Sequence, residues 1–205
     1  MVRAVIFDLD GVIADSSAEI TLALQETFAE FGFPRPEREK VLAVESLGSA
    51  KIVESLLPPE RRGDDALKKA VLERYAKVSV ERIGRIKPVA GAKELLRFLR
   101  AKGVKAAVAT NRGETAHALI RALGLEGMID AVVASSDVKN LKPHPEPLLL
   151  ALKRVGVEAG DALFVGDSQA DAEAGRAAGI RTVLYGKKCS GCASVGSLLE
   201  LEGMV

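Results

Sequence analysis

The 205-residue sequence lacks tryptophan, and aromatic residues make up only 4% of it. No apolar run approaches the roughly 20 residues that cross a bilayer, and the N-terminus leads into a predicted strand without a signal-peptide pattern. An excess of charge of one sign is also missing, because the formal net charge is +1. Such an excess would favour nucleic acid or an anionic membrane surface. We therefore expect a cytoplasmic protein that binds neither nucleic acid nor membrane.

Cysteine is scarce, and both copies lie in the stretch Cys189-Ser190-Gly191-Cys192. This spacing suits two zinc ligands, but no second pair and no nearby histidine would complete a site within one chain. A disulfide and two free thiols both stay open as alternatives.

Hydrophobic residues make up 48% of the sequence, and their spacing divides it into two kinds of segment. Five apolar runs have the length and boundaries of buried strands, at residues 2–7, 104–109, 129–134, 162–165 and 181–185. Helical patterns alternate with these strands from residue 92 onward. The sequence predicts a Rossmann-like α/β fold, in which a parallel five-stranded sheet carries helices on both faces.

The segment between the first and second strands differs from the rest, because apolar residues recur there only at helical spacing, as in Ile20, Leu24 and Phe28. We predict an all-helical cap domain at residues 16–86. It would be inserted into an α/β core formed by residues 1–15 and 87–205.

Polar residues follow the predicted strands and connections in a fixed order. Asp8 and Asp10 end the first strand, and Gly11 suits the sharp bend that must follow. Neighbouring side chains of a strand point to opposite faces, so the two carboxylates converge only if the chain leaves strand geometry at Leu9. The other motifs are Thr110-Asn111, Lys142-Pro143 and Gly166-Asp167-Ser168-Gln169-Ala170-Asp171. Parallel sheets bind ligands beyond the carboxyl ends of their strands, where these motifs should meet.

These four motifs, in this order, resemble those of the haloacid dehalogenase superfamily of phosphohydrolases. The sequence is most similar to the branch with a helical cap after the first motif, which includes phosphoglycolate phosphatases and β-phosphoglucomutases. The resemblance covers the chain up to Tyr185. It implies a Mg²⁺-dependent phosphatase that hydrolyses a small, phosphoglycolate-like phosphomonoester through an aspartyl-phosphate intermediate.

The resemblance also implies roles for individual residues. Asp8 would be the nucleophile, and Asp10 would act as acid and then as base. The phosphate would be held by the Thr110 hydroxyl, the amides of Asn111 and Arg112 at a helix N-terminus, and the fixed cation of Lys142. Mg²⁺, which prefers oxygen ligands, would be held by Asp8, the backbone carbonyl of Asp10, and Asp167. Asp171, one helical turn after Asp167, would assist directly or through a metal-bound water.

Selection of the leaving group is expected in the cap, at residues 45–51. Lys51 is the candidate partner there for a carboxylate or a second phosphate of the substrate. Residues 44–51 contain no arginine, whereas the mutases carry an arginine-flanked loop in the cap. We therefore expect water, and not a sugar, to accept the phosphoryl group.

Several alternatives remain beside this prediction. The other reactions open to the same site are β-phosphoglucomutase-like transfer and inorganic pyrophosphatase activity. A dehalogenase and a phosphonate hydrolase are disfavoured, because neither chemistry uses the acid–base of Asp10. The intact acidic set argues against a non-catalytic binding protein. Both a monomer and a homodimer fit the sequence.

Overall fold

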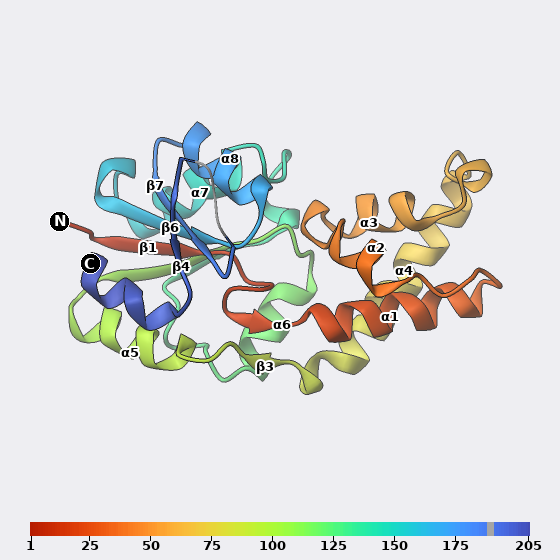
Figure 1. The fold of residues 1–205 in the computed structure, drawn as a ribbon, viewed down its shortest axis with the longest axis horizontal. Helices are drawn as coiled ribbons and strands as arrows, with labels where there is room; N and C mark the ends of the chain where they lie inside the picture. Colours follow the sequence, from red (N-terminus) through yellow and green to blue (C-terminus); the bar gives the residue numbers. More distant parts are fainter. Residues whose placement is uncertain (188–190) are drawn as a thin grey trace.

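The computed structural model describes residues 1–187 and 191–205, and its main sheet contains six strands in this part of the chain (Figure 1). Their order is β5-β4-β1-β6-β7-β8, and every neighbouring pair is parallel. The strands are β1 (Ala4–Phe7), β4 (Lys105–Ala109), β5 (Ala131–Val133), β6 (Ala162–Gly166), β7 (Arg181–Tyr185) and β8 (Ala193–Val195). The five predicted strands are all present.

The sixth strand, β8, was not predicted, because Ala193-Ser194-Val195 lies outside any longer apolar run. It pairs with β7 at the edge of the sheet. The choice between a disulfide and two free thiols involves Cys189, which lies outside the described residues.

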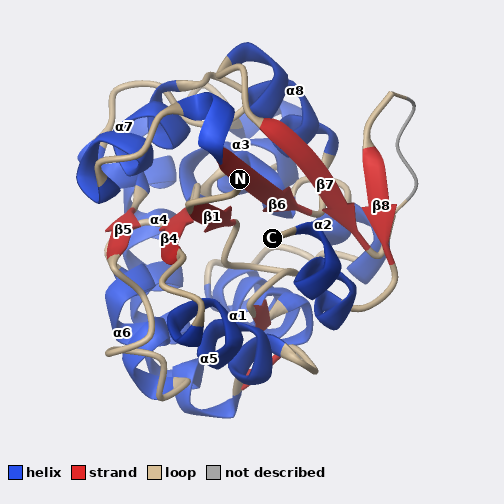
Figure 2. Ribbon diagram, turned by 90° about the vertical axis from the view of Figure 1, so that its left-hand side faces the viewer, coloured by secondary structure: helices blue, strands red, loops and turns tan. Residues whose placement is uncertain are grey.

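Helices cover both faces of the sheet, as Figure 2 shows. Val5 and Phe7 of β1 belong to the core cluster that includes side chains of α5 (Ala92–Ala101) and α6 (Thr115–Ala122). Ala4 and Ile6 point to the opposite cluster, with α7 (Glu146–Val155) and α8 (Gln169–Ala177). This alternation along a central, fully buried strand confirms the Rossmann-like α/β class.

The segment after β1 is helical and has a hydrophobic core of its own. Its helices are α1 (Ser17–Glu30), α2 (Arg38–Leu42), α3 (Ser49–Leu56) and α4 (Asp65–Arg82), with 3-10 turns η1 (Glu45–Leu47), η2 (Pro59–Arg61) and η3 (Ile83–Arg85). The core includes Leu24, Phe28, Val53 and Val71. Its division from the α/β part as a separate domain stays a prediction.

The two connections between the helical segment and the sheet lie side by side. Strands β2 (Ala14–Asp15) and β3 (Lys87–Pro88) pair in an antiparallel ribbon. The insertion therefore leaves and re-enters the α/β part at one place, close to the end of β1.

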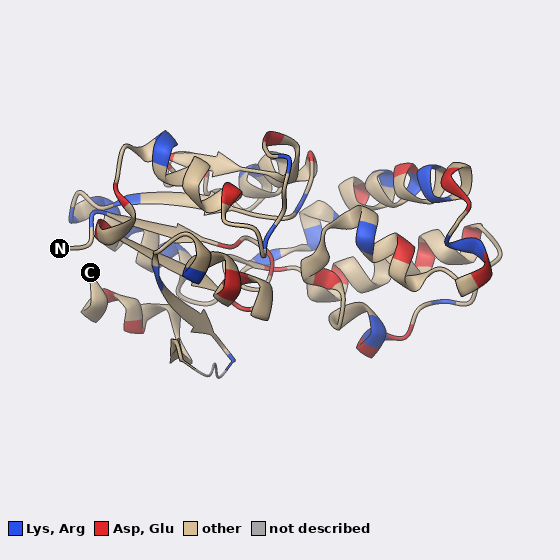
Figure 3. Ribbon diagram, turned by 90° about the horizontal axis from the view of Figure 1, so that it is seen from above, with Lys and Arg blue, Asp and Glu red and all other residues tan. Residues whose placement is uncertain are grey.

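Charges of both signs are interspersed over the helical segment (Figure 3). Ion pairs join α1 to α4, with Arg74 2.6 Å from Glu30 and Arg82 2.8 Å from Glu19. Among the described residues, no helix combines the length and the apolar character needed to cross a bilayer.

Helix α8 carries Asp171, and its close approach to the sheet depends on Gly175. A Cβ atom at Gly175 would overlap Thr182 Oγ1 and lie 3.3 Å from Phe164 Cδ1. Within a helix, alanine is otherwise about 1 kcal/mol more favourable than glycine. Glycine at this position therefore reflects packing and not helix propensity.

We expect Gly175→Ala to lower the free energy of unfolding by about 1–3 kcal/mol, because α8 must move away from β7. Urea denaturation measures the change. The control is Gly84→Ala, where the new Cβ would meet no atom within 4 Å and stability should be nearly unchanged. A Gly175→Ala variant as stable as the parent protein would contradict this account of the packing.

Candidate active site

The carboxyl ends of β1, β4 and β6 bring the predicted motifs together. The Asp8 amide donates to Val165 O at 2.8 Å, so the ladder between β1 and β6 continues one residue past β1. The chain then bends at Leu9, and Gly11 has a φ of +80°. A Cβ atom at Gly11 would lie 2.6 Å from Asp167 Oδ2. Glycine is required at this bend by both its backbone conformation and its closeness to Asp167.

Three carboxylates, those of Asp8, Asp167 and Asp171, form one cluster. Each offers an oxygen within 4.8 Å of the other two. Hard divalent cations such as Mg²⁺ prefer oxygen ligands of this kind. The donor set therefore fits such a cation.

Asp171 is oriented by the first turn of α8. Ser168 caps this helix and donates its hydroxyl to Asp171 Oδ2 at 2.5 Å. The amides of Ser168 and Asp167 donate to the same oxygen at 3.0 and 3.2 Å. The other oxygen, Oδ1, faces Lys142, so both oxygens of this fully buried carboxylate have fixed surroundings.

Lys142 lies between Asp8 and Asp171, with 2% of its side chain exposed. Its Nζ is 2.8 Å from Asp8 Oδ1 and 2.7 Å from Asp171 Oδ1. Burial lowers the pKa of Lys142, but the charges of Asp171 and Asp8 outweigh this effect and raise it. The ammonium group therefore stays charged.

The charge of one ammonium group does not balance the charges of three carboxylates. The consequence is largest for the pKa of Asp8. Burial raises its pKa to about 8; Lys142 opposes this shift, whereas the charges of Asp171 and Asp167 add to it. A cation bound among the three carboxylates would relieve this repulsion. The repulsion among the carboxylates and the oxygen donors that they offer therefore both favour a bound divalent cation.

Lys187, which the sequence analysis missed, also faces the cluster, at 3.5 Å from Asp167 Oδ2. It follows the end of β7, so the rule that ligands bind beyond strand ends could have identified it.

Asn111 fixes the backbone of Lys142 and also reaches the helical segment. Its Oδ1 accepts from the Lys142 amide at 2.9 Å, and its Nδ2 donates to Lys142 O at 3.0 Å. The same Nδ2 donates to Ser46 O at 2.8 Å. The side chain of Asn111 therefore links the lysine to the loop where leaving-group contacts were predicted.

The carboxylate of Asp10 is paired with Arg112 and not with the acidic cluster. Arg112 Nη2 lies 2.7 Å from Asp10 Oδ1, and its Nε lies 2.9 Å from Oδ2. The Ser16 hydroxyl donates to Oδ1 at 2.5 Å. Burial opposes ionisation of Asp10, but Arg112 and Ser16 outweigh it and hold the pKa below its usual value. The participation of the Asp10 carbonyl in metal binding stays a prediction.

The expected helix N-terminus at Asn111 and Arg112 needs correction. Helix α6 begins only at Thr115, because the chain after β4 first makes an extended turn. In this turn the Arg112 amide donates to Thr110 Oγ1 at 3.0 Å. Thr110, Asn111 and Arg112 therefore lie in the loop that precedes α6, and their phosphate-binding roles stay predictions.

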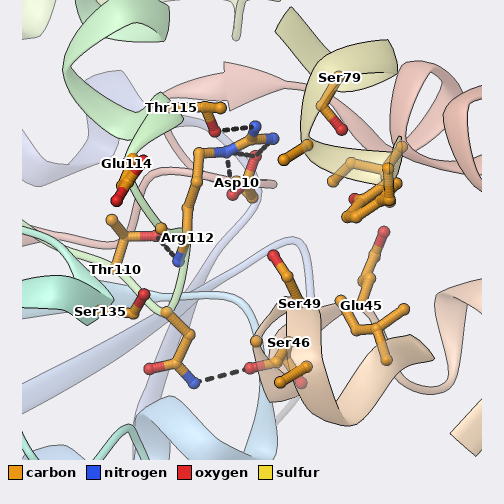
Figure 4. A pocket seen from close by; sticks show the side chains of 18 of the residues that line it. Asp10, Glu45, Ser46, Ser49, Ser79, Thr110, Arg112, Glu114, Thr115 and Ser135 are labelled. Carbon is orange, nitrogen blue, oxygen red and sulfur yellow. Dashed lines mark hydrogen bonds and ion pairs between the residues drawn. The ribbon is translucent and has the colours of Figure 1, made fainter. Parts of the chain in front are cut away.

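A cavity of about 980 Å³ opens between this site and the helical segment. Figure 4 shows Glu45, Ser46 and Ser49 on one side of it, with Asp10 and Arg112 across from them. A volume of this size suits a small metabolite.

Lys51 was predicted to contact the substrate, but it is not among the described residues that line the cavity. Helix α3 turns this side chain to solvent, while its buried residues Ile52 and Val53 pack into the core of the segment. A contact of Lys51 with the substrate stays a prediction, whereas five other residues of the stretch 45–51 do line the cavity.

Comparison with known proteins identifies hydrolases with similar sequences. A family profile described as "Haloacid dehalogenase-like hydrolase" matches residues 5–185. The chain is 35% identical over 189 residues to an N-acetylmuramic acid 6-phosphate phosphatase of Pseudomonas putida, covering 90% of this chain and 83% of that protein. It is also 35% identical over 211 residues to a phosphoglycolate phosphatase of Rhodospirillum rubrum, covering 98% and 88%.

Among solved structures, a β-phosphoglucomutase of Clostridium difficile superposes with a TM-score of 0.88. The alignment covers 98% of this chain and 93% of that protein, at 22% identity. This likeness shows a shared fold.

The pair of Asp10 and Arg112 should stabilise the folded protein, and a double-mutant cycle with Asp10→Asn and Arg112→Met tests it. We expect a coupling of about 1–3 kcal/mol in urea denaturation, because only 8% of the Arg112 side chain and 22% of that of Asp10 are exposed. The control is the pair of Arg74 and Glu30, which is more exposed and should couple clearly less. Equal coupling in the two cycles would contradict the special role of the buried pair.

Proposed function

This chain belongs to the haloacid dehalogenase-like hydrolase family, and we propose that it is a Mg²⁺-dependent phosphatase of a small organic phosphomonoester. The observation that carries the proposal is the position of Asp8. It ends the central strand, contacts a buried lysine at 2.8 Å, and shares a cluster with Asp167 and Asp171. A nucleophilic carboxylate needs such surroundings to meet an anionic phosphate.

In the proposed reaction, Asp8 attacks phosphorus and the bond from phosphorus to the leaving oxygen breaks, giving an aspartyl-phosphate. The amide of Leu9 donates to Asp8 Oδ1 at 2.7 Å, and Lys142 contacts the same oxygen, so the carboxylate plane is fixed before the substrate binds. Water then hydrolyses the intermediate and restores Asp8.

Asp10 exchanges the protons in both steps. It gives one to the leaving oxygen and later takes one from the attacking water. Its ion pair with Arg112 favours the ionised carboxylate, which is the form that the second step needs. The first step requires a protonated Asp10, a form that the neighbouring Arg112 disfavours.

The phosphate oxygens are neutralised by Lys142 and by the bound cation, which we infer to be Mg²⁺. Asp8, Asp167 and Asp171 would hold it. When bound, it supplies positive charge that lets an anionic phosphate approach the carboxylates. Thr110, buried beside Asp8 at the end of the neighbouring strand, would contact a phosphate oxygen.

Two relatives above are named for hydrolysis of phosphomonoesters, of phosphoglycolate in one case and of a sugar acid phosphate in the other. Their names support water as the acceptor. The cytoplasmic location, the division into core and cap, and the choice between monomer and homodimer stay predictions from the sequence.

Asp8→Asn should abolish turnover while the protein still folds, because an amide cannot form the acyl phosphate. Release of inorganic phosphate from a panel of phosphomonoesters measures turnover, and circular dichroism checks the fold. The control is Asp15→Asn, an exposed carboxylate of β2, which should keep its activity. An active Asp8→Asn variant would refute the mechanism. Conversion of β-glucose 1-phosphate to glucose 6-phosphate with little free phosphate would instead identify a mutase.

Mg²⁺ should raise the temperature of thermal unfolding, because it binds three carboxylates that repel one another only in the folded protein. We expect the shift to be lost in Asp167→Asn and kept in Asp161→Asn, whose carboxylate lies away from the cluster beside Arg3.

Removal of metal with EDTA should stop phosphate release, and added Mg²⁺ should restore it. Full activity in EDTA, with no metal bound, would overturn the proposed metal requirement.

A further inference from the structure

Glu45 carries a carboxylate that the proposed reaction leaves without a role. It begins the turn η1 and lines the cavity opposite Asp10 and Arg112 (Figure 4). Its Oε2 is buried and has no hydrogen-bond partner among the described residues. An unpaired buried carboxylate oxygen costs stability, so this group is suited to receive a donor from a ligand.

The charges around Glu45 are mainly negative. Burial raises the pKa of Glu45; a hydrogen bond with the Ser17 side chain opposes this, the charges of Asp167 and Asp10 add to it, and Lys187 opposes it. A second anion placed here would be repelled. A hydroxyl or ammonium donor would be attracted.

The cations that line the cavity are already engaged or exposed. They are Arg112, Lys77 and Lys187. Arg112 is bound to Asp10, and Lys187 lies 3.5 Å from Asp167. Lys77 is exposed on α4. Among the described residues that line the cavity, no buried cation is therefore left to pair with a carboxylate of the substrate.

We propose that Glu45 selects the leaving group by accepting a hydrogen bond from a hydroxyl or ammonium group close to the ester oxygen. The substrates favoured are phosphate esters of polyhydroxy or amino alcohols, and a carboxylate at the same position is disfavoured. Rotation about the last torsion of a glutamate is soft, so either oxygen can turn toward the ligand. The inference rests on the proposed phosphatase function, since it concerns the leaving group of that reaction.

Three substrates of one length test it: 2-hydroxyethyl phosphate, O-phosphoethanolamine and 2-phosphoglycolate. They place a hydroxyl, an ammonium and a carboxylate at the same distance from the ester. We expect kcat/KM to be about tenfold or more higher for the first two than for 2-phosphoglycolate, the value of one hydrogen bond to a charged group. For a compound that turns over poorly, its inhibition constant against p-nitrophenyl phosphate compares the binding affinities instead.

Glu45→Gln keeps the size of the side chain and removes its charge. It should lower kcat/KM for O-phosphoethanolamine and raise it for 2-phosphoglycolate, which reduces the preference about tenfold. The matched control is Glu73→Gln, which removes a carboxylate from the exposed part of the same cavity and should leave the preference unchanged.

Two results would overturn the inference while the phosphatase proposal stands. One is a preference of the parent protein for 2-phosphoglycolate, and the other is an unchanged preference in Glu45→Gln. Absence of phosphate release from every substrate with Mg²⁺ present, p-nitrophenyl phosphate included, would overturn the phosphatase proposal and this inference with it.

Discussion

The structure of the site depends on the burial of one ammonium group, that of Lys142. A buried charge without partners costs several kcal/mol, so Lys142 is stable only while Asp8 and Asp171 remain beside it. One partner comes from the end of β1 and the other from the first turn of α8. Asn111, just after β4, holds the lysine backbone. A shift of any of these elements would separate the charges. The ion pairs of the site therefore require the observed arrangement of the strands and of α8.

Asn111 also connects Lys142 to the helical segment. Its Nδ2 donates to Ser46 O as well as to Lys142 O. Close by, a Cβ atom at Gly48 would lie 2.8 Å from Leu141 Cδ1 and 3.3 Å from Asn111 O. Glycine suits this close approach, because its φ of +86° is one that other residues rarely adopt. The cavity wall and the lysine are therefore positioned by a shared residue.

The sequence was sufficient for the features that arise from local periodicity and from the rule for parallel strands. It predicted five of the six described strands of the main sheet, and it predicted that Asp8, Lys142, Asp167 and Asp171 would meet. It could not predict the pairing of Arg112 with Asp10, because the two residues are 102 positions apart and each also suits another role. The outward position of Lys51 could be predicted from the sequence, because the neighbouring Ile52 and Val53 mark the inner face of α3.

Reaction chemistry and substrate choice rest on different physical foundations in this chain. The acidic cluster and Lys142 lie at strand ends, where ladder register and burial leave each side chain little freedom. Glu45 instead lies in a short turn between helices, and its position depends on how the helical segment packs. Replacement of the Glu45 side chain changes the charge facing the leaving group, whereas the ion pairs of Lys142 involve Asp8 and Asp171. Similarity to relatives is therefore a stronger guide to the reaction than to the substrate, which is read from the carboxylate of Glu45.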